Sequence, residues 1–393
     1  MKIDWFSCGD RQASSVGLFR IAADCPQLVV DQGDTPYVED SASNFRGVTT
    51  TRAIYTSTVD DMFAHYVQVM NDPAFQAVQA LRSRGLLYYK MRDDHEWGGD
   101  DWDNSPIQAN DPTGPIGGAA AGGAGPPTQA EVDAHSYVST QAFLRAAAIY
   151  YDNPTNVDAP SVDKPDGAAA GTAASQYPVT YFRQGFDYDG GKLPAGQSGN
   201  IEVFVIDCVS SRSFLANTDN SSKYMLGPNQ EAWLLARLLA STATWKLIFT
   251  GKVTFKPSGG GNSDTWNEYQ TQRTRILDYI KNNNIKGVVW LTGDKHLPHV
   301  VSLAVANSDA YDHVCICACP ISVPTNGLMT GTMNGVVWQG ADDRYSRCYG
   351  RLLITSTQLK IEIVRVTDGS VMWRGSMIPT SNALVSNPAK VVS

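Results

Sequence analysis

The sequence has few positive charges and no long apolar run. Its 393 residues include 31 Lys and Arg against 39 Asp and Glu, so the formal net charge is -8 and the pI is about 5.2. No basic run is present, which argues against nucleic-acid binding through phosphate neutralisation. No apolar stretch reaches the roughly eighteen residues that a membrane-spanning helix needs, so we expect no membrane span.

Targeting and disulfide signals are also missing. The N-terminal stretch MKIDWFSCGD has one Lys, no apolar h-region and no twin-arginine pair, so it is not a signal peptide. This predicts either a cytoplasmic protein or an exported one whose leader is absent from this sequence. The seven cysteines are scattered and none has CxxC spacing, which argues against a disulfide framework. For a single cysteine such as Cys8, a buried inert thiol is the ordinary interpretation.

Loops that cradle nucleotide phosphates are absent as well, because neither GxGxxG nor GxxxxGK[ST] occurs in a suitable place. What the sequence does contain is a series of short apolar runs that end in polar or acidic residues. Such runs are typical of buried strands that open into loops. They are QLVVDQGD, GLLYYKMRDDHE, IEVFVIDC, WKLIFTG and IKGVVWLTGDKH.

Helical patterns lie between these runs, and the alternation predicts an α/β domain with mixed sheets. The candidate helices are residues 59–82 (interrupted at Pro73), 141–151, 230–239 (preceded by Pro228) and 266–282. The tail alternates apolar and polar residues and turns at Asp368-Gly369, which predicts antiparallel strands. Residues 1–8 are expected to add an edge strand.

Two stretches rich in Gly, Ala and Pro, residues 111–127 and 154–175, flank a predicted helix at about 130–152. They are typical of loops, so we expect this helix to be an insertion that lies over one face of the domain. No internal repeat and no clear domain linker is present.

Three polar clusters follow predicted strands. Ligands collect at the carboxyl ends of strands in open α/β sheets, so the clusters converge if the strands share a sheet. Each cluster alone could be an ordinary turn or solvated loop, but packed carboxylates are costly without a cation between them. Oxygen and nitrogen donors predict hard or borderline cations. The clusters are Asp31, Asp34 and Tyr37; Asp93, Asp94, His95 and Glu96, followed by Asp100, Asp101, Asp103 and Asn104; and Asp294, Lys295 and His296, followed by His299.

Taken in order, the motifs resemble those of the PhoD-like alkaline phosphatases and phosphodiesterases, within the calcineurin-like metallophosphatases. The stretches that carry the resemblance cover most of the chain: FSCGD, DQGDTPY, YYKMRDDHEWGGDDWDN, YFRQG, VFVIDCVSSRS, MLGPNQEAWLLARLLASTATWKLIFTGKVTF, DTWNEYQTQR and VVWLTGDKH. The resemblance implies a sandwich of two mixed β-sheets flanked by helices, with antiparallel C-terminal strands. It implies one domain over residues 1–393, with the insertion at about 105–180 and without the family's frequent N-terminal β-sandwich domain.

The resemblance also implies a metal centre. Cys8 would supply a thiolate, Asp34 a carboxylate and Tyr37 a phenolate to a ferric ion, whose charge would deprotonate the thiol and the phenol. Asp34 would bridge to a second metal, which in the resembling enzymes is calcium, an ion that prefers oxygen ligands. Zinc, manganese or magnesium are the alternatives to these ions.

The remaining implied metal ligands are Asp94 and Asn104 on the calcium side, with Asp294 and His296 closing the site from the third cluster. Asp93, Asp100 and Asp101 are expected to be solvated or to support the ligands. His299 stays open between the rim of the site and a structural role.

The implied activity is hydrolysis of a phosphomonoester or phosphodiester by a metal-activated water or hydroxide, with inorganic phosphate as a product. His95, Asp94 and Arg212 are the candidate catalytic residues. The family usually has an arginine two residues after Asp207, and this chain has Val209 there, so the roles of Asp207 and Arg212 stay open. Alternatives are a phosphotriesterase- or phospholipase-D-like hydrolase, or a metal-binding protein without turnover. The oligomeric state is not predicted.

Overall fold

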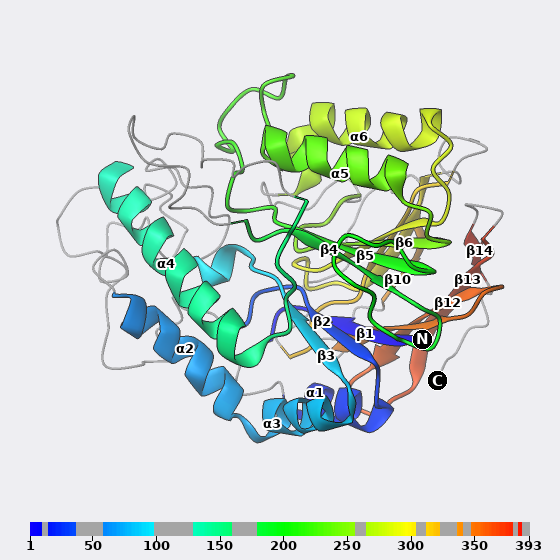
Figure 1. Ribbon diagram of the computed structural model, residues 1–393, viewed down its shortest axis with the longest axis horizontal. Helices are drawn as coiled ribbons and strands as arrows, with labels where there is room; N and C mark the ends of the chain where they lie inside the picture. Colours follow the sequence, from blue (N-terminus) through cyan, green and yellow to red (C-terminus); the bar gives the residue numbers. More distant parts are fainter. Residues whose placement is uncertain are drawn as a thin grey trace.

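Two seven-stranded mixed β-sheets form the centre of the computed structural model (Figure 1). The structure describes residues 1–9, 15–36, 58–97, 129–158, 179–255, 265–303, 312–322, 336–340, 347–379 and 384–386. The first sheet has the order β14-β13-β12-β11-β1-β2-β3, and the second has the order β10-β8-β9-β7-β6-β5-β4. The predicted fold class, two mixed sheets flanked by helices, is therefore confirmed.

The strands of the first sheet are β1 (Lys2–Phe6), β2 (Leu28–Asp31), β3 (Leu87–Lys90), β11 (Cys348–Ile354), β12 (Leu359–Arg365), β13 (Val371–Met377) and β14 (Leu384–Ser386). Those of the second sheet are β4 (Phe182–Phe186), β5 (Ile201–Ile206), β6 (Trp245–Thr250), β7 (Val288–Thr292), β8 (His299–Ser302), β9 (Val314–Cys317) and β10 (Val336–Gln339). In the first sheet the parallel strands β1, β2 and β3 lie at one side. In the second sheet the parallel strands β5, β6, β7 and β9 lie at the centre.

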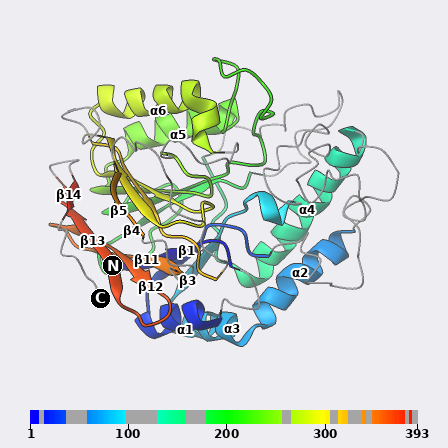
Figure 2. The ribbon, with the colours of Figure 1, turned by 180° about the vertical axis from the view of Figure 1, so that it is seen from behind.

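Helices cover the outer face of each sheet, as the opposite views in Figures 1 and 2 show. The helices on the side of the first sheet are α1 (Ser15–Asp24), α2 (Val59–Asn71), α3 (Pro73–Ala80) and α4 (Gln129–Tyr150); those on the side of the second are α5 (Pro228–Ala240) and α6 (Gln270–Asn282). Short 3-10 turns are η3 (Leu81–Arg84), η4 (Asp94–Glu96) and η7 (Trp266–Tyr269). None of the described helices combines the length and the apolar character needed to cross a bilayer.

Apolar side chains fill the space between the layers. Trp5 and Val30 of the first sheet belong to the same buried cluster as Val203 and Leu247 of the second, so the two sheets pack face to face. A second buried cluster lies between the first sheet and its helices, and a third lies between the second sheet and its helices. Every residue of β5, β6 and β7 is buried, as expected for parallel strands covered on both faces.

Several local predictions are confirmed. The predicted helix over residues 59–82 breaks before Pro73, because Asp72 ends α2 and caps α3 by accepting a hydrogen bond from the Ala74 amide at 2.8 Å. Pro228 occupies the first turn of α5. The tail forms the antiparallel strands β11, β12 and β13.

One expectation about the sheets was wrong, and one condition on which the convergence of the polar clusters was based is not met. β1 is not an edge strand, because it pairs with β11 on one side and with β2 on the other. The strands that carry the polar clusters do not share one sheet: β2 and β3 belong to the first and β7 to the second. Within the predicted insertion at about 105–180, only α4 and the residues up to 158, together with 179 and 180, lie among the described residues.

Candidate metal centre

The candidate site lies where the carboxyl ends of parallel strands from both sheets meet. Cys8 follows β1, Asp34 follows β2, and η4 with Asp94 follows β3; these three strands are parallel neighbours. Asp294 and His296 follow β7 of the second sheet. The clusters therefore converge although they come from two sheets, because the sheets pack face to face with these strand ends on the same side.

Hydrogen bonds between loops hold these strand ends together. The buried Gln32 amide donates to the carbonyl oxygen of Leu291, at the end of β7, over 2.6 Å, and to that of Thr250, at the end of β6, over 3.3 Å. The Ser7 hydroxyl accepts a hydrogen bond from the Asp294 amide at 3.3 Å. Ser7, directly after β1, and Gln32, directly after β2, thus tie the first sheet to the second.

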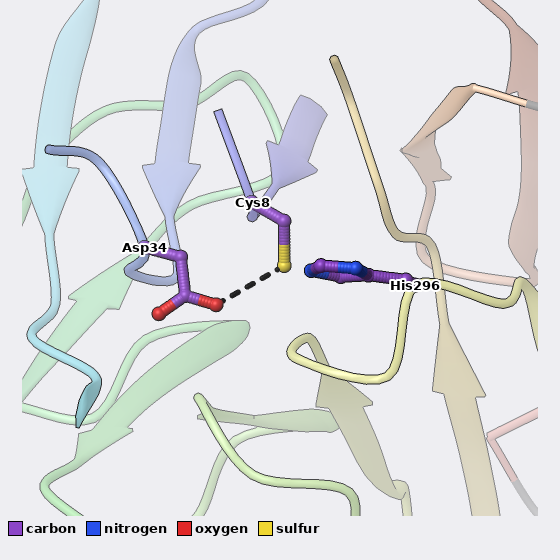
Figure 3. Close-up of side chains that lie close together, drawn as sticks. All are labelled: Cys8, Asp34 and His296. Carbon is purple, nitrogen blue, oxygen red and sulfur yellow. Dashed lines mark hydrogen bonds between the residues drawn. The ribbon is translucent and has the colours of Figure 1, made fainter. Parts of the chain in front are cut away.

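The first donor group consists of Cys8, Asp34 and His296, whose potential ligand atoms all lie within 4.8 Å of one another. Figure 3 shows the Cys8 sulfur between the Asp34 carboxylate and the His296 ring. Cys8 Sγ lies 3.2 Å from Asp34 Oδ2. Cys8 and Asp34 are buried. A thiolate, a carboxylate and an imidazole from three separate strand ends form a donor set suited to a transition metal.

Two further donor groups share Asp34. One contains Asp34, Asp94 and His95, and the other contains Asp34, Asp93, Asp94 and Asp294. The second of these, which we call the third donor group, is rich in carboxylates and resembles an oxygen site for a hard cation. Asp93 belongs to this group and is fully buried, which excludes the solvated alternative and leaves the one in which it supports the ligands.

Electrostatics in the site depend on burial and on one lysine. Burial raises the pKa of the Cys8 thiol well above its usual value, and the neighbouring Cys319 adds to the effect. Burial also raises the pKa of Asp34, and the nearby Cys8 raises it further. Burial acts in the same direction on Asp94, but Lys252 and His95 outweigh it and hold the pKa of Asp94 below its usual range.

These residues fit a bound cation. Among the described residues, the buried oxygens Asp34 Oδ1 and Asp93 Oδ2 have no hydrogen-bond partner. A buried carboxylate oxygen without a donor is costly, and a cation would compensate it. A cation would also lower the raised pKa values of Cys8 and Asp34 and so deprotonate both groups.

Glu96 belongs to the second polar cluster, but its sequence pattern did not predict its role, which is to hold the loops of the site. Its carboxylate accepts hydrogen bonds from the amides of Asp34 at 2.9 Å, Thr35 at 2.7 Å and Asp93 at 2.9 Å. It also pairs at 2.7 Å with Lys90, which pairs with Asp31 at 2.9 Å. The loops after β2 and β3 are therefore tied to one buried carboxylate.

Asp207 and Arg212, whose roles the sequence left open, have different surroundings. Asp207 accepts hydrogen bonds from the amides of Val209 and Ser210 at 2.9 and 2.8 Å, so it shapes the turn after β5. Arg212 is fully buried, and its charge helps to lower the pKa of Asp94. His299 is buried on β8, where its ring contacts the Leu297 carbonyl oxygen at 2.8 Å.

Some of the predicted site residues lie outside the described part of the chain. They are Tyr37, Asn104, Asp100, Asp101 and Asp103.

The fold and the converging donors define a two-sheet α/β sandwich with a candidate metal centre where strand ends of both sheets meet. The model of the PhoD-like phosphatase family matches residues 196–345. This part of the chain is similar to the PhoD-like phosphatases, and the resemblance predicted from the sequence motifs is confirmed.

Two proteins illustrate what the chain is similar to. Alkaline phosphatase D of Bacillus subtilis (strain 168) is 36% identical over 124 residues, which cover 27% of this chain and 21% of that protein. The aligned part thus spans about a fifth of the curated relative. A solved structure described as that of PhoD superposes with a TM-score of 0.68 at 18% identity, covering 100% of this chain and 72% of the other. At this identity the likeness supports the fold.

Proposed function

We propose that the protein is a metal-dependent phosphoric ester hydrolase, acting on a phosphomonoester or phosphodiester and releasing a phosphate product. The observation that carries the proposal is the convergence of Cys8, Asp34, His296 and the Asp93–His95 segment at one meeting point of the two sheets. The PhoD-like match over residues 196–345 supports the same reaction class. The predicted single domain, with an insertion that shapes access to the site, is part of this proposal.

We further propose a ferric ion at the first donor group, where Cys8, Asp34 and His296 meet, with Tyr37 as an added ligand. Calcium is proposed at the side of Asp34 and Asp94, with Asn104. Bound cations there would polarise a phosphoryl oxygen and lower the pKa of a water molecule. Elemental analysis of the purified protein would distinguish iron and calcium from the alternatives zinc, manganese and magnesium.

The chain's own groups have separate tasks in this proposal. His95 lies beside Asp94 and Asp34 and transfers the proton during cleavage of the ester. Its side chain is 9% exposed, which makes it slightly more accessible than the buried carboxylates around it. Arg212 acts as a positioning residue, because its charge favours the ionised form of Asp94.

Hydrolysis of nitrophenyl phosphate and bis-nitrophenyl phosphate tests the reaction class. We expect turnover of at least one ester, and its loss after the metal ions are removed. Asp34→Asn should abolish turnover while the circular dichroism spectrum stays that of the folded protein. A metal-loaded protein that hydrolyses neither ester would instead favour a metal-binding protein or a phosphotriesterase- or phospholipase-D-like hydrolase, to be tested with a triester and a phospholipid.

Substitution of Cys8 tests the iron site. Cys8→Ser replaces a soft thiolate donor by a hydroxyl, so we expect lower iron content and loss of any thiolate-to-iron absorption band. Cys25→Ser is the matched control, because Cys25 is an exposed thiol that follows α1. Equal iron content in the two variants would remove Cys8 from the ligand set.

A further inference from the structure

Lys252 lies among the carboxylates of the third donor group. It follows β6 directly after Gly251, and its side chain is completely buried. Its Nζ lies 2.8 Å from Asp93 Oδ1, 2.9 Å from Asp94 Oδ2 and 2.8 Å from Asp294 Oδ1. These are distances of charge-assisted hydrogen bonds. One ammonium group therefore contacts three carboxylates that come from two different strand ends.

The position of Lys252 depends on the absence of a side chain at Gly251. A Cβ atom there would lie 2.7 Å from Asp93 Oδ2 and 3.3 Å from the Gln32 carbonyl oxygen. The loop after β6 can thus approach the loop after β3 closely enough to place the ammonium between the carboxylates. Lysine is well suited to this place, because its ammonium is a compact charge with three N–H donors.

A metal ion in the third donor group would need the same carboxylates. Asp34, Asp93, Asp94 and Asp294 offer oxygens within 4.8 Å of one another, and Lys252 contacts Asp93, Asp94 and Asp294. A divalent ion placed there would compete with the ammonium for ligands and would be repelled by it at close range. Asp34 also belongs to the first donor group, so its carboxylate can serve a metal ion there.

We propose that Lys252 is the built-in cation of the third donor group, so that the centre binds one metal ion fewer than its three donor groups would allow. The proposal rests on the proposed metallophosphatase function and deepens it. Bound metal ions would be held by Cys8, Asp34 and His296 and by the group of Asp34, Asp94 and His95. Lys252 compensates part of the charge of Asp93, Asp94 and Asp294, and this contribution persists when a chelator removes the metal ions.

The test compares the metal content of the wild type, Lys252→Ala and Lys246→Ala. Lys246 is the matched control: it is a buried lysine on β6 whose Nζ donates to the carbonyl oxygens of Ala243 and Lys286. Each protein is dialysed to equilibrium against calcium, and bound metals are counted by elemental analysis. We expect Lys252→Ala to bind one more calcium ion per chain than the wild type, and Lys246→Ala to match the wild type. An unchanged count in Lys252→Ala overturns the proposal.

Two further measurements keep the proposal testable if Lys252→Ala folds poorly. The wild type should bind no more than two metal ions per chain, so a third ion in the wild type overturns the proposal without any variant. The urea midpoint of Lys252→Ala should fall in a chelator and recover in calcium, whereas a midpoint that calcium leaves unchanged contradicts it. If the counts agree but no ester is hydrolysed, the proposed function fails and the assignment of Lys252 stands.

Discussion

Glu96 offers a sharp test of how the candidate site is held together. Its Oε1 accepts hydrogen bonds from the Thr35 amide and the Lys90 ammonium, and its Oε2 accepts them from the amides of Asp34 and Asp93. Both oxygens face donors only. In Glu96→Gln one oxygen becomes an NH₂ group, and either orientation of this amide places donors against donors.

The cost follows from these contacts. Two buried donors lose their acceptor in the variant, at about 1–3 kcal/mol each. In one orientation Lys90 also loses a carboxylate partner, and breaking a buried ion pair costs about 3–5 kcal/mol. We therefore expect Glu96→Gln to lower the free energy of unfolding by about 3–5 kcal/mol, although the side chain keeps its shape.

Urea unfolding in a chelator, followed by tryptophan fluorescence, measures this change without a contribution from bound metal. Glu268→Gln is the control, because Glu268 is exposed in η7 and its substitution should change stability by less than about 0.5 kcal/mol. A loss of less than about 1 kcal/mol in Glu96→Gln would refute the view that this carboxylate holds the two loops.

Two further predictions concern a buried histidine and a close approach of loops. Burial lowers the pKa of His299 from 6.5 to about 4, so the unfolded chain takes up a proton first and stability falls as the pH drops from about 6.5 towards 4. Between pH 7 and pH 5 the wild type should lose about 2 kcal/mol more than His299→Gln in urea titrations, and parallel pH profiles would contradict this. Gly251→Ala would place a Cβ 2.7 Å from Asp93 Oδ2; it should lower the free energy of unfolding by about 1–3 kcal/mol in urea titrations, and an unchanged value would contradict the close approach.

Much of the fold could be predicted because the signals were local. Apolar runs that end in acids marked β2, β3 and β7, and Pro73 marked the break between α2 and α3. The position of β1 could not be found in this way. Its neighbour β11 lies more than three hundred residues along the chain, and nothing in the sequence of a short strand indicates whether one or both of its edges will be paired.

The site could be predicted in part for the same reason. Asp34, Asp94 and Asp294 stand directly behind apolar runs, where their type and place are informative. Lys252 also stands behind such a run, in FTGKV, but a lysine after a glycine is typical of a solvated loop. Only the packing of the two sheets brings its ammonium to carboxylates of distant segments, so its role depends on tertiary contacts that no local pattern carries.

Backbone conformation provides an argument for the site that is independent of its donor atoms. Of the described residues other than glycine, six have positive φ, and four of them are candidate donors: Cys8 at 57°, Asp34 at 57°, Asp294 at 69° and His296 at 51°. The other two, Cys25 and Asn284, follow α1 and α6, where a left-handed residue ordinarily ends a helix. No such helix end explains the four donors, and each left-handed conformation costs about 1–3 kcal/mol unless its surroundings enforce it. Hydrogen bonds from the Cys8 amide to the Gly33 carbonyl oxygen and from Gly9 to that of Asp34 enforce two of them. Strain concentrated at these strand ends is what a centre shaped for ligand binding requires, and a merely solvated acidic loop would have no reason to retain it.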